Sequence, residues 1–512
     1  MSDSRTKNSA KNVAAGFACQ GAALLLSFVS RSVFVMVLSS EYLGINGLFS
    51  NILTVRSFAE LGIGEALSYA MYQPAKEGNR EKLCQLMRLY KTAYRGIALF
   101  VTVVGVIASF FLDYLVAEKP NIPENFQLIF WLFLFNNVCS YLLAYKQSIL
   151  LVEQKKYIVL YIQQGTKVAQ LLLQMAILFF AHSYYGFLLV QVICTLLTNV
   201  FISLYVKKAY PWLNDRSVQA PLPQEEQHKI VKDVKALAIS KVAGIVSNGS
   251  DNIVIAKILG LTSVGVVSNY TLVINSFSSI LWGTLSGITG SMGNFNVNAS
   301  VEKRRAIFEE LYLIVYWIFC LCCTCLIVLL NPFVEIWVGT SYQTDLPIVV
   351  ALVLIAYVSG MNFPVYTFRV TCGLFDEMKY PYFWSGIANV ALSVVLALKM
   401  GLFGVYIATV ITRLLISETV EGYIVYHKIL EKPFWRYVMR YLLSLLLLAG
   451  CTLICGKIVQ GVPGTGILAL LIKGLVTFCL CNAILLLVFA RTPTFARVCQ
   501  RMKKLVDKKK AR

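Results

Sequence analysis

The sequence predicts an all-α, polytopic membrane protein of about fourteen transmembrane helices, with two six-helix lobes in a parallel pseudo-twofold repeat and two further C-terminal helices. Three observations predict this fold class: the apolar composition, the placement of basic residues between apolar segments, and an internal duplication. The 512 residues are 58% hydrophobic and only 14% charged, whereas soluble domains are roughly 45–50% apolar and about 25% charged. The mean hydropathy is +0.69. These values exclude an ordinary soluble globule and a disordered chain.

Apolar segments long enough to cross a bilayer, which takes about 20 residues, follow one another along the chain. The first of them is too long for the core of a signal peptide and no small-residue cleavage site follows it, so we expect it to be retained. The last two have no counterpart in the duplicated part and are expected to pack outside the twelve-helix core. The predicted spans are 13–38, 43–72, 92–116, 126–152, 157–181, 184–206, 235–259, 263–294, 308–330, 346–372, 381–399, 402–427, 437–457 and 465–490.

The basic residues fall in alternate loops between these spans. The chain has 46 Lys and Arg against 26 Asp and Glu, a net charge of +20. Loops on one side and the C-terminal tail hold most of the basic residues, whereas the loops on the other side hold only Lys119, Lys399 and Lys457. This positive-inside pattern predicts an even number of spans with both termini in the cytoplasm. The basic charge therefore reflects orientation, and we expect no nucleic-acid partner.

The two halves of the chain resemble each other. Tyr42-Leu-Gly44 opens the second span and matches Ser263-Val-Gly265 in the eighth, at an offset of 221 residues. The segment 186–193 in the sixth span matches 404–411 in the twelfth, at an offset of 218. Because each half holds six spans, the repeat is parallel, with its axis along the membrane normal, and such lobes suit alternating access around a central cavity. The predicted organisation is an N-lobe at 1–206, a cytoplasmic linker at 207–234, a C-lobe at 235–427, and a final helix pair with a basic tail at 428–512.

Cations inside the predicted spans are candidate ligands for an anionic cargo. Arg31, Arg56 and Lys167 lie within spans of the N-lobe, where an ionised group costs about 2.5–3.5 kcal/mol on insertion scales. If they face inward, the cavity wall is cationic, and an arginine fork suits a diphosphate because it donates two parallel hydrogen bonds. The alternative to a ligand role is a purely structural one. In it, Arg56 forms an ion pair with Glu60 one helical turn away, and the remaining cations stabilise the packing of the helices.

Acidic residues in the spans are candidates for ion coupling. Asp251 in the seventh span either takes up H⁺ or Na⁺ or pairs with a cation across the lobe interface, and Glu60 is a second coupling candidate. Arg369 lies near a helix end and is expected to extend its head group to the interface. We expect no resident cofactor and no metal.

Two further features limit the function. The cysteine-rich run Cys320-Leu-Cys322-Cys323-Thr-Cys325 lies in one unbroken apolar segment, so these thiols are expected to pack as small apolar side chains rather than to bind metal. No G-x-x-x-x-G-K-[ST] sequence occurs, so no nucleotide is expected to bind in a P-loop.

Three stretches of the sequence carry a family resemblance. Phe58-Ala-Glu60-Leu-Gly62-Ile-Gly64-Glu-Ala-Leu67 is similar to a D-L-G-L-x-x-A-L stretch in the second span of the Wzx-type polysaccharide flippases, which belong to the multidrug/oligosaccharidyl-lipid/polysaccharide (MOP) exporter superfamily. Pro332-Phe-Val-Glu-Ile-Trp-Val-Gly339-Thr-Ser-Tyr342 resembles the stretch after the ninth span, and Asn389-Val-Ala-Leu with 401–409 resembles the eleventh and twelfth. The resemblance covers about 13–490, and the family's acidic residue in the second span is Glu60 here.

The resemblance implies a flippase that moves an undecaprenyl-pyrophosphate-linked oligosaccharide repeat unit across the bacterial cytoplasmic membrane. It implies a role in O-antigen and lipopolysaccharide, capsule or exopolysaccharide biosynthesis, alongside a polysaccharide polymerase and glycosyltransferases. Related lipid II flippases use arginines in spans 1, 2 and 8, and Arg31 and Arg56 match the first two by span. The eighth span here contains no Lys or Arg, so Lys167 or Arg413 is expected to substitute for the third.

Three alternatives remain open. A drug or cation antiporter of the MATE type would be expected to have an acidic, aromatic cavity. A lipid II flippase for peptidoglycan would share the cationic cavity and differ in cargo. A polysaccharide polymerase or lipid-linked glycosyltransferase would need a large outer loop with catalytic groups, but the longest predicted outer loop is short, at 331–345, so we do not expect an enzyme.

Overall fold

The computed structural model describes residues 25–53, 63–117, 120–153, 155–214, 222–226, 230, 250–374 and 376–510. Throughout these residues the chain is helical and contains no β-strand, which confirms the predicted all-α class. Nine helices in the described part are long and apolar enough to cross a membrane. Contacts divide the chain into two compact units, Met1–Gly265 and Val266–Arg512.

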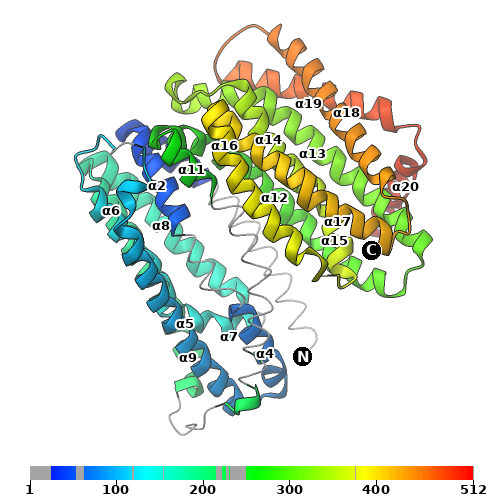
Figure 1. Cartoon of the computed structure of the whole chain (residues 1–512). Helices are drawn as coiled ribbons and strands as arrows, with labels where there is room; N and C mark the ends of the chain where they lie inside the picture. The colour runs from blue at the N-terminus through cyan, green and yellow to red at the C-terminus, as the bar shows by residue number, and fades with distance from the viewer. Residues whose placement is uncertain are drawn as a thin grey trace. The chain divides into compact units, whose positions relative to one another are not determined.

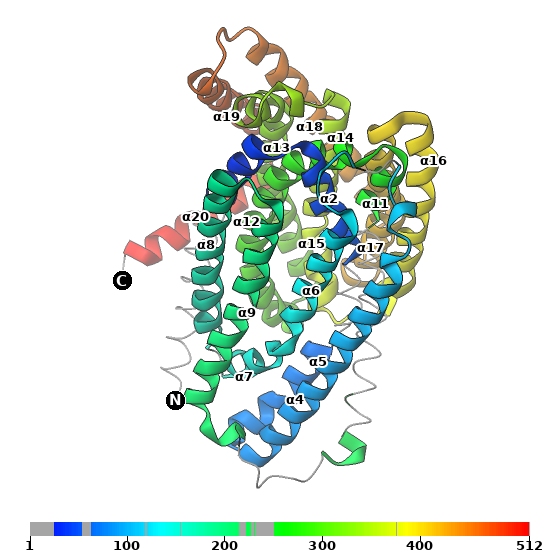
Figure 2. The same cartoon turned by 90° about the vertical axis from the view of Figure 1, so that its left-hand side faces the viewer.

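The first unit is built on four long helices that pack as neighbours (Figure 2). Helix α5 contacts α6, α6 contacts α9, and α9 contacts α8 along most of its length. Polar caps fix several starts, because the side chains of Asn79, Asn125 and Ser183 accept hydrogen bonds from the backbone of the first turn. The helices are Leu25–Val37, α2 (Ser40–Ile52), α4 (Ile63–Glu77), α5 (Arg80–Ser109), α6 (Phe126–Leu142), α7 (Gln147–Val152), α8 (Lys156–Ala181), α9 (Tyr184–Ala209) and α11 (Asp251–Ile258).

Two glycines allow α2 to cross the first turn of α12 (Leu261–Asn298) at backbone contact. A Cβ atom on Gly44 would overlap the carbonyl of Leu261, and a Cβ atom on Gly265 would overlap the carbonyl of Ser40. The contact is reciprocal, because the offset of 221 residues that relates Gly44 to Gly265 also relates Ser40 to Leu261. A contact in which two equivalent segments exchange roles is the signature of a twofold relation, as the parallel repeat predicts.

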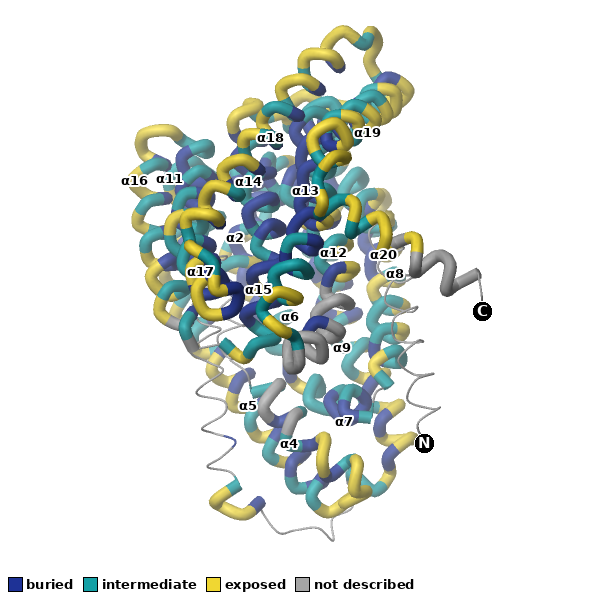
Figure 3. Tube along the Cα trace, turned by 90° about the vertical axis from the view of Figure 1, so that its right-hand side faces the viewer, coloured by how far each residue is buried: buried dark blue, intermediate teal, exposed yellow. Residues whose placement is uncertain are grey.

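The second unit is organised around α13 (Val301–Val338). Helices α14 and α19 lie along it, and α18 packs on both α13 and α19 (Figure 1). The central turns of α13 are buried, whereas α18 and α19 expose broad apolar faces (Figure 3). The other helices are α14 (Leu346–Met361), α15 (Phe363–Thr371), α16 (Lys379–Thr412), α17 (Thr419–Ile424), α18 (Trp435–Gln460), α19 (Ile467–Phe489) and α20 (Pro493–Lys510).

Helix α16 is two helices that meet at Gly401. This glycine has φ 60°, a left-handed conformation that glycine adopts at little cost. Beyond it the chain folds back, so that Asn389 Nδ2 donates to Thr409 Oγ1 at 2.8 Å and Ser385 Oγ donates to the Thr412 carbonyl at 3.4 Å. The hairpin corresponds to the two predicted spans 381–399 and 402–427.

Candidate functional site

A polar cavity of about 420 Å³ lies inside the first unit. Six helical elements supply its wall, and nearly all the lining side chains carry an amide, a hydroxyl or an amine. The lining residues are Tyr94 on α5, Asn136, Asn137 and Ser140 on α6, Ala144 and Gln147 after it, Gln163, Thr166, Lys167 and Gln170 on α8, and Thr195, Thr198 and Asn199 on α9.

Lys167 is the one charged side chain among the described residues that line this cavity, and none of them is acidic. It lines the cavity from α8, and its side chain is exposed. A cation with no carboxylate among the described residues around it attracts an anion that enters the cavity. The structure therefore places the predicted Lys167 in a wall that can bind ligand, although its role in binding cargo stays a prediction.

The uncharged polar groups around Lys167 are held by hydrogen bonds to one another. Thr195 Oγ1 donates to Asn136 Oδ1 at 2.8 Å, and the hydroxyls of Thr166 and Thr198 are 2.7 Å apart. Each of these groups has further donor or acceptor capacity. A chamber of fixed amides and hydroxyls can exchange hydrogen bonds with a hydroxyl-rich ligand, which pays little desolvation cost on entering it.

Sequence reasoning identified Lys167 but missed these uncharged neighbours. A signal for them exists, because Gln163, Thr166, Lys167, Gln170 and Gln174 recur at the spacing of one helix face. The same polar stripe explains why α8, although 26 residues long, is absent from the nine apolar helices found in the described part.

The other predicted cargo ligands are not gathered at this cavity. Arg31 lies half-buried on the helix Leu25–Val37 and is not among the described residues lining it. Arg56 and Glu60 lie outside the described residues. Their proposed roles stay predictions.

The second unit contains a buried ionic network. Arg369 Nε lies 2.5 Å from Glu421 Oε1, and their exposed fractions are 4% and 0%. Glu421 also accepts hydrogen bonds from Asn362 Nδ2 at 2.8 Å and Tyr382 OH at 3.0 Å. The expectation that Arg369 reaches the interface is therefore wrong, because Glu421 satisfies its charge inside the protein.

Arg413 and Asp251 each lie on described helices. Arg413 donates from Nη1 to Ser359 Oγ at 2.5 Å, at the start of a π-helical segment, Arg413–Glu418. Asp251 is half-buried in the first turn of α11, where a carboxylate interacts favourably with the helix dipole. Cargo binding by Arg413 and ion coupling by Asp251 stay predictions.

Among the residues that the structure describes, one group of side chains is close enough together to bind a metal ion, and it consists of three cysteines. The sulfur atoms of Cys320 on α13, Cys451 on α18 and Cys481 on α19 all lie within 4.8 Å of one another. Each is fully buried. The convergence was not visible in the sequence, where the cysteines belong to three different apolar runs.

An apolar groove of about 680 Å³ runs along the second unit between α13, α18 and the end of α19. Its wall is mainly aliphatic and aromatic, and its one polar end carries charged and hydroxyl groups. The residues at the polar end are Glu309, Arg436, Arg440, Thr492 and Thr494, and those along the wall include Leu443, Leu446, Leu447, Val488 and Phe489. A groove of this character fits a hydrocarbon chain with an anionic head.

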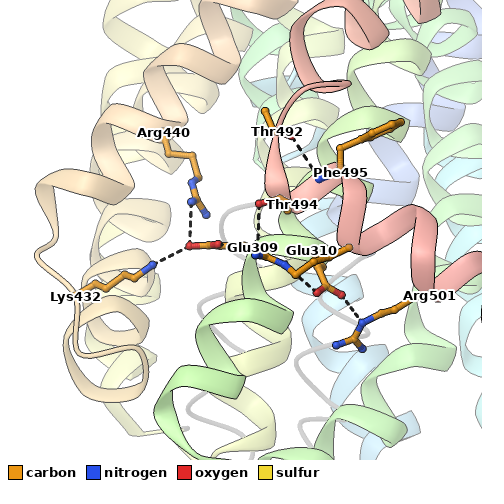
Figure 4. Close-up of polar contacts among 9 residues, drawn as sticks. Glu309, Glu310, Lys432, Arg440, Thr492, Thr494, Phe495 and Arg501 are labelled. Atoms are coloured by element: carbon orange, nitrogen blue, oxygen red, sulfur yellow. Dashed lines mark hydrogen bonds and ion pairs between the residues drawn. The ribbon is translucent and has the colours of Figure 1, made fainter.

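Two carboxylates on α13 hold α18 and α20 at this polar end (Figure 4). Glu309 pairs with Lys432 at 2.8 Å, Arg497 at 3.2 Å and Arg440 at 3.6 Å. Glu310, which is nearly buried, pairs with Arg501 at 2.7 Å and with Arg497 Nε at 3.4 Å. Arg497 and Arg501 of α20 are thus attached to α13 by ion pairs.

Replacing Glu310 with Gln is expected to loosen α20. The change removes the charge while keeping the shape, so Arg497 and Arg501 lose their ion pairs with the nearly buried carboxylate. We expect amide exchange in α20 to accelerate about fivefold, equivalent to ~1 kcal/mol, the upper end for partly exposed pairs. Hydrogen–deuterium exchange measures this, with Glu302→Gln on an exposed part of α13 as the control. Equal exchange in both variants would show that the apolar contacts alone hold α20.

The fold has known counterparts. The sequence matches no model of a protein family and no curated protein. The structure is similar to the lipid II flippase MurJ in an inward closed conformation, with a TM-score of 0.63 and 15% identity over 93% of this chain and 99% of that one. It is similar to a multidrug resistance MATE family transporter of the MOP superfamily, inward-facing, with a TM-score of 0.56 and 15% identity over 84% and 95% of the two chains. It is also similar to a MOP superfamily transporter from Pyrococcus furiosus, with a TM-score of 0.52 and 14% identity over 82% and 95%.

These likenesses show the fold. The structural neighbours are MOP superfamily members, named as a flippase and as transporters and not as enzymes. The chain therefore shares the fold of these membrane proteins, and nine helices of its described part are long and apolar enough to cross a membrane. Identities of 14–15% leave the cargo to be argued from the site itself.

Proposed function

We propose that the chain is a flippase that moves a polyprenyl-pyrophosphate-linked oligosaccharide across the bacterial cytoplasmic membrane for surface polysaccharide synthesis. The observation that carries this proposal is the polar cavity of the first unit, in which one cation, Lys167, stands among amides and hydroxyls and no lining residue is acidic among those described.

The cavity matches the two chemical parts of such a head group. Each sugar hydroxyl costs about 4–8 kcal/mol to bury unpaired in hydrocarbon, and the amide and hydroxyl groups of the wall can pair with it. The diphosphate needs a cation, which Lys167 supplies and which Arg31, Arg56 and Arg413 are proposed to supplement. The apolar groove on the second unit supports the proposal as well, because its volume and its lining suit a prenyl chain.

The wall of the cavity argues against a transporter of cationic drugs. A lone cation without a carboxylate repels a positively charged ligand. A lipid II flippase remains the second candidate, because its head group also joins a diphosphate to sugars, and the structural likeness to MurJ is compatible with it. We further propose that H⁺ or Na⁺ drives transport, with Asp251 and Glu60 as the coupling groups.

Replacing Lys167 with Ala is expected to slow flipping of a lipid-linked oligosaccharide in proteoliposomes by about tenfold or more. A hydrogen bond to a charged group contributes about 1.5–3 kcal/mol, and losing it in the rate-limiting state lowers the rate by the corresponding factor. Lys167→Arg should retain part of the rate because it keeps the charge. Lys156→Ala is the matched control, since Lys156 is exposed on the same helix.

The same assay separates the candidate cargoes. Lipid II offered in place of the lipid-linked repeat unit should be flipped more slowly if the proposal holds, and faster if the chain serves peptidoglycan. A normal initial rate for Lys167→Ala at equal protein level would remove the cavity from the mechanism.

A further inference from the structure

A second, strongly basic cavity of about 370 Å³ lies in the first unit. We call it the basic pocket. Four of its lining residues are cations, Arg88, Lys91, Lys146 and Lys207, and Tyr145 and Tyr210 stand beside them. It shares no lining residue with the cavity around Lys167. The proposed function therefore makes no use of it.

The cations converge from three separate elements. Arg88 and Lys91 are three residues apart on α5 and share one face of that helix. Lys146 ends the short 3-10 helix Ala144–Lys146, and Lys207 lies in the last turn of α9. The hydrogen bond from Lys146 Nζ to Ser203 Oγ at 2.6 Å fixes its position.

No carboxylate is among the described residues that line this pocket. Glu153, which lies nearby, pairs with Lys155 at 3.3 Å. Lys91 and Lys207 are close enough to Lys146 for their charges to repel it. Gathering like charges in a concave site costs free energy that a bound anion offsets.

Tyr210 adds a neutral hydrogen-bonding group. Its hydroxyl accepts a hydrogen bond from Lys155 Nζ at 3.0 Å. Burial raises the pKa of Tyr210, so the phenol stays protonated and keeps its O–H as a donor. The wall thus combines four ammonium or guanidinium groups with phenol donors.

Orientation alone does not produce this arrangement. The positive-inside rule places Lys and Arg on the cytoplasmic side, and Lys208, next to Lys207, satisfies it without lining the basic pocket. The rule does not require four cations from three elements to face one hollow.

We propose that the basic pocket binds a phosphate-bearing anion, either the diphosphate of a prenyl-linked molecule or the phosphate of an anionic lipid head group. The phosphate chemistry stands independently of the proposed flipping activity. Only the version in which the diphosphate belongs to the cargo rests on that function.

The test measures binding to the full-length protein in a neutral detergent at low ionic strength. Inorganic pyrophosphate is titrated while thermal unfolding is followed, which gives an apparent Kd. We expect Lys91→Gln/Lys207→Gln to weaken binding at least tenfold relative to the unchanged protein. Lys208→Gln and Lys156→Ala should bind like the unchanged protein, because neither residue lines this pocket. Lys167→Ala reports any pyrophosphate that binds in the other cavity.

Two further arms identify the source of the phosphate. Geranylgeranyl diphosphate is added to protein in neutral nanodiscs, and the second arm uses nanodiscs containing phosphatidylglycerol. If geranylgeranyl diphosphate stabilises the protein only when Lys91 and Lys207 are present, the ligand of the basic pocket is a prenyl diphosphate. If phosphatidylglycerol does so, the ligand is a lipid head group. Either result supports the proposal. Equal loss in Lys208→Gln, or loss in Lys167→Ala with none in the double variant, would overturn it. Because no flipping is measured, the proposed function can fail while this result stands.

Discussion

Replacing Glu421 with Leu is expected to destabilise the second unit by about 3–5 kcal/mol, because it leaves a buried arginine without its counter-charge. Arg369 and Glu421 are 4% and 0% exposed and lie 2.5 Å apart. Water cannot solvate the orphaned guanidinium without opening the helices around it. Glu421 also accepts hydrogen bonds from Asn362 and Tyr382, so two half-buried donors lose their partner as well.

The double variant Arg369→Met/Glu421→Leu separates charge burial from packing. Removing both charges should recover much of the stability, since apolar replacements of buried ion pairs are often neutral or better. Thermal unfolding in detergent, followed by size-exclusion chromatography of the surviving protein, measures each step.

Glu377→Leu is the matched control, because it makes the same substitution at an ion pair that is partly exposed. Its carboxylate lies 3.1 Å from Lys428 Nζ, with 49% of the lysine side chain exposed, and such pairs contribute about 0–1 kcal/mol. If Glu421→Leu behaves like this control, or if the double variant is no better than the single one, the pair does not stabilise the unit.

The helices could be predicted from the sequence because apolar runs record burial in lipid directly. The predicted span 157–181 agrees closely with α8, which runs from Lys156 to Ala181. The predicted span 184–206 agrees in the same way with α9, which runs from Tyr184 to Ala209. The start of α5 at Arg80, well before the predicted 92, was missed because its first turns are amphipathic rather than apolar.

Side-chain partners between helices could not be predicted in the same way. Arg369 and Glu421 are 52 residues apart, and hydropathy does not reveal which faces of two helices meet. The same reason applies to the wall around Lys167, whose amides and hydroxyls come from helices distant in the sequence. A single ionisable residue in an apolar run is conspicuous, whereas its uncharged neighbours are not.

Replacing Gly44 or Gly265 with Val is expected to prevent α2 and the start of α12 from crossing, with a stability loss at or above the upper end of the usual 1–3 kcal/mol for overpacking. In each case the added Cβ meets a backbone carbonyl, of Leu261 or of Ser40, rather than a flexible side chain. The cost therefore cannot be relieved by a rotamer change, and the helices must separate. Gly450→Val on α18 is the control, because no atom lies within 4 Å of its Cβ position.

Because the contact is reciprocal, the double variant tests it more stringently than either single substitution does. Separating the two helices once relieves both overlaps, so the double variant Gly44→Val/Gly265→Val should lose less stability than the sum of the two single losses. Unfolding temperatures of the four proteins in detergent give the coupling energy directly. If the loss of stability in the double variant equals the sum of the two single losses, the two overlaps are independent. The contact between the repeat-related segments would then not be reciprocal in energy, which would contradict their twofold relation.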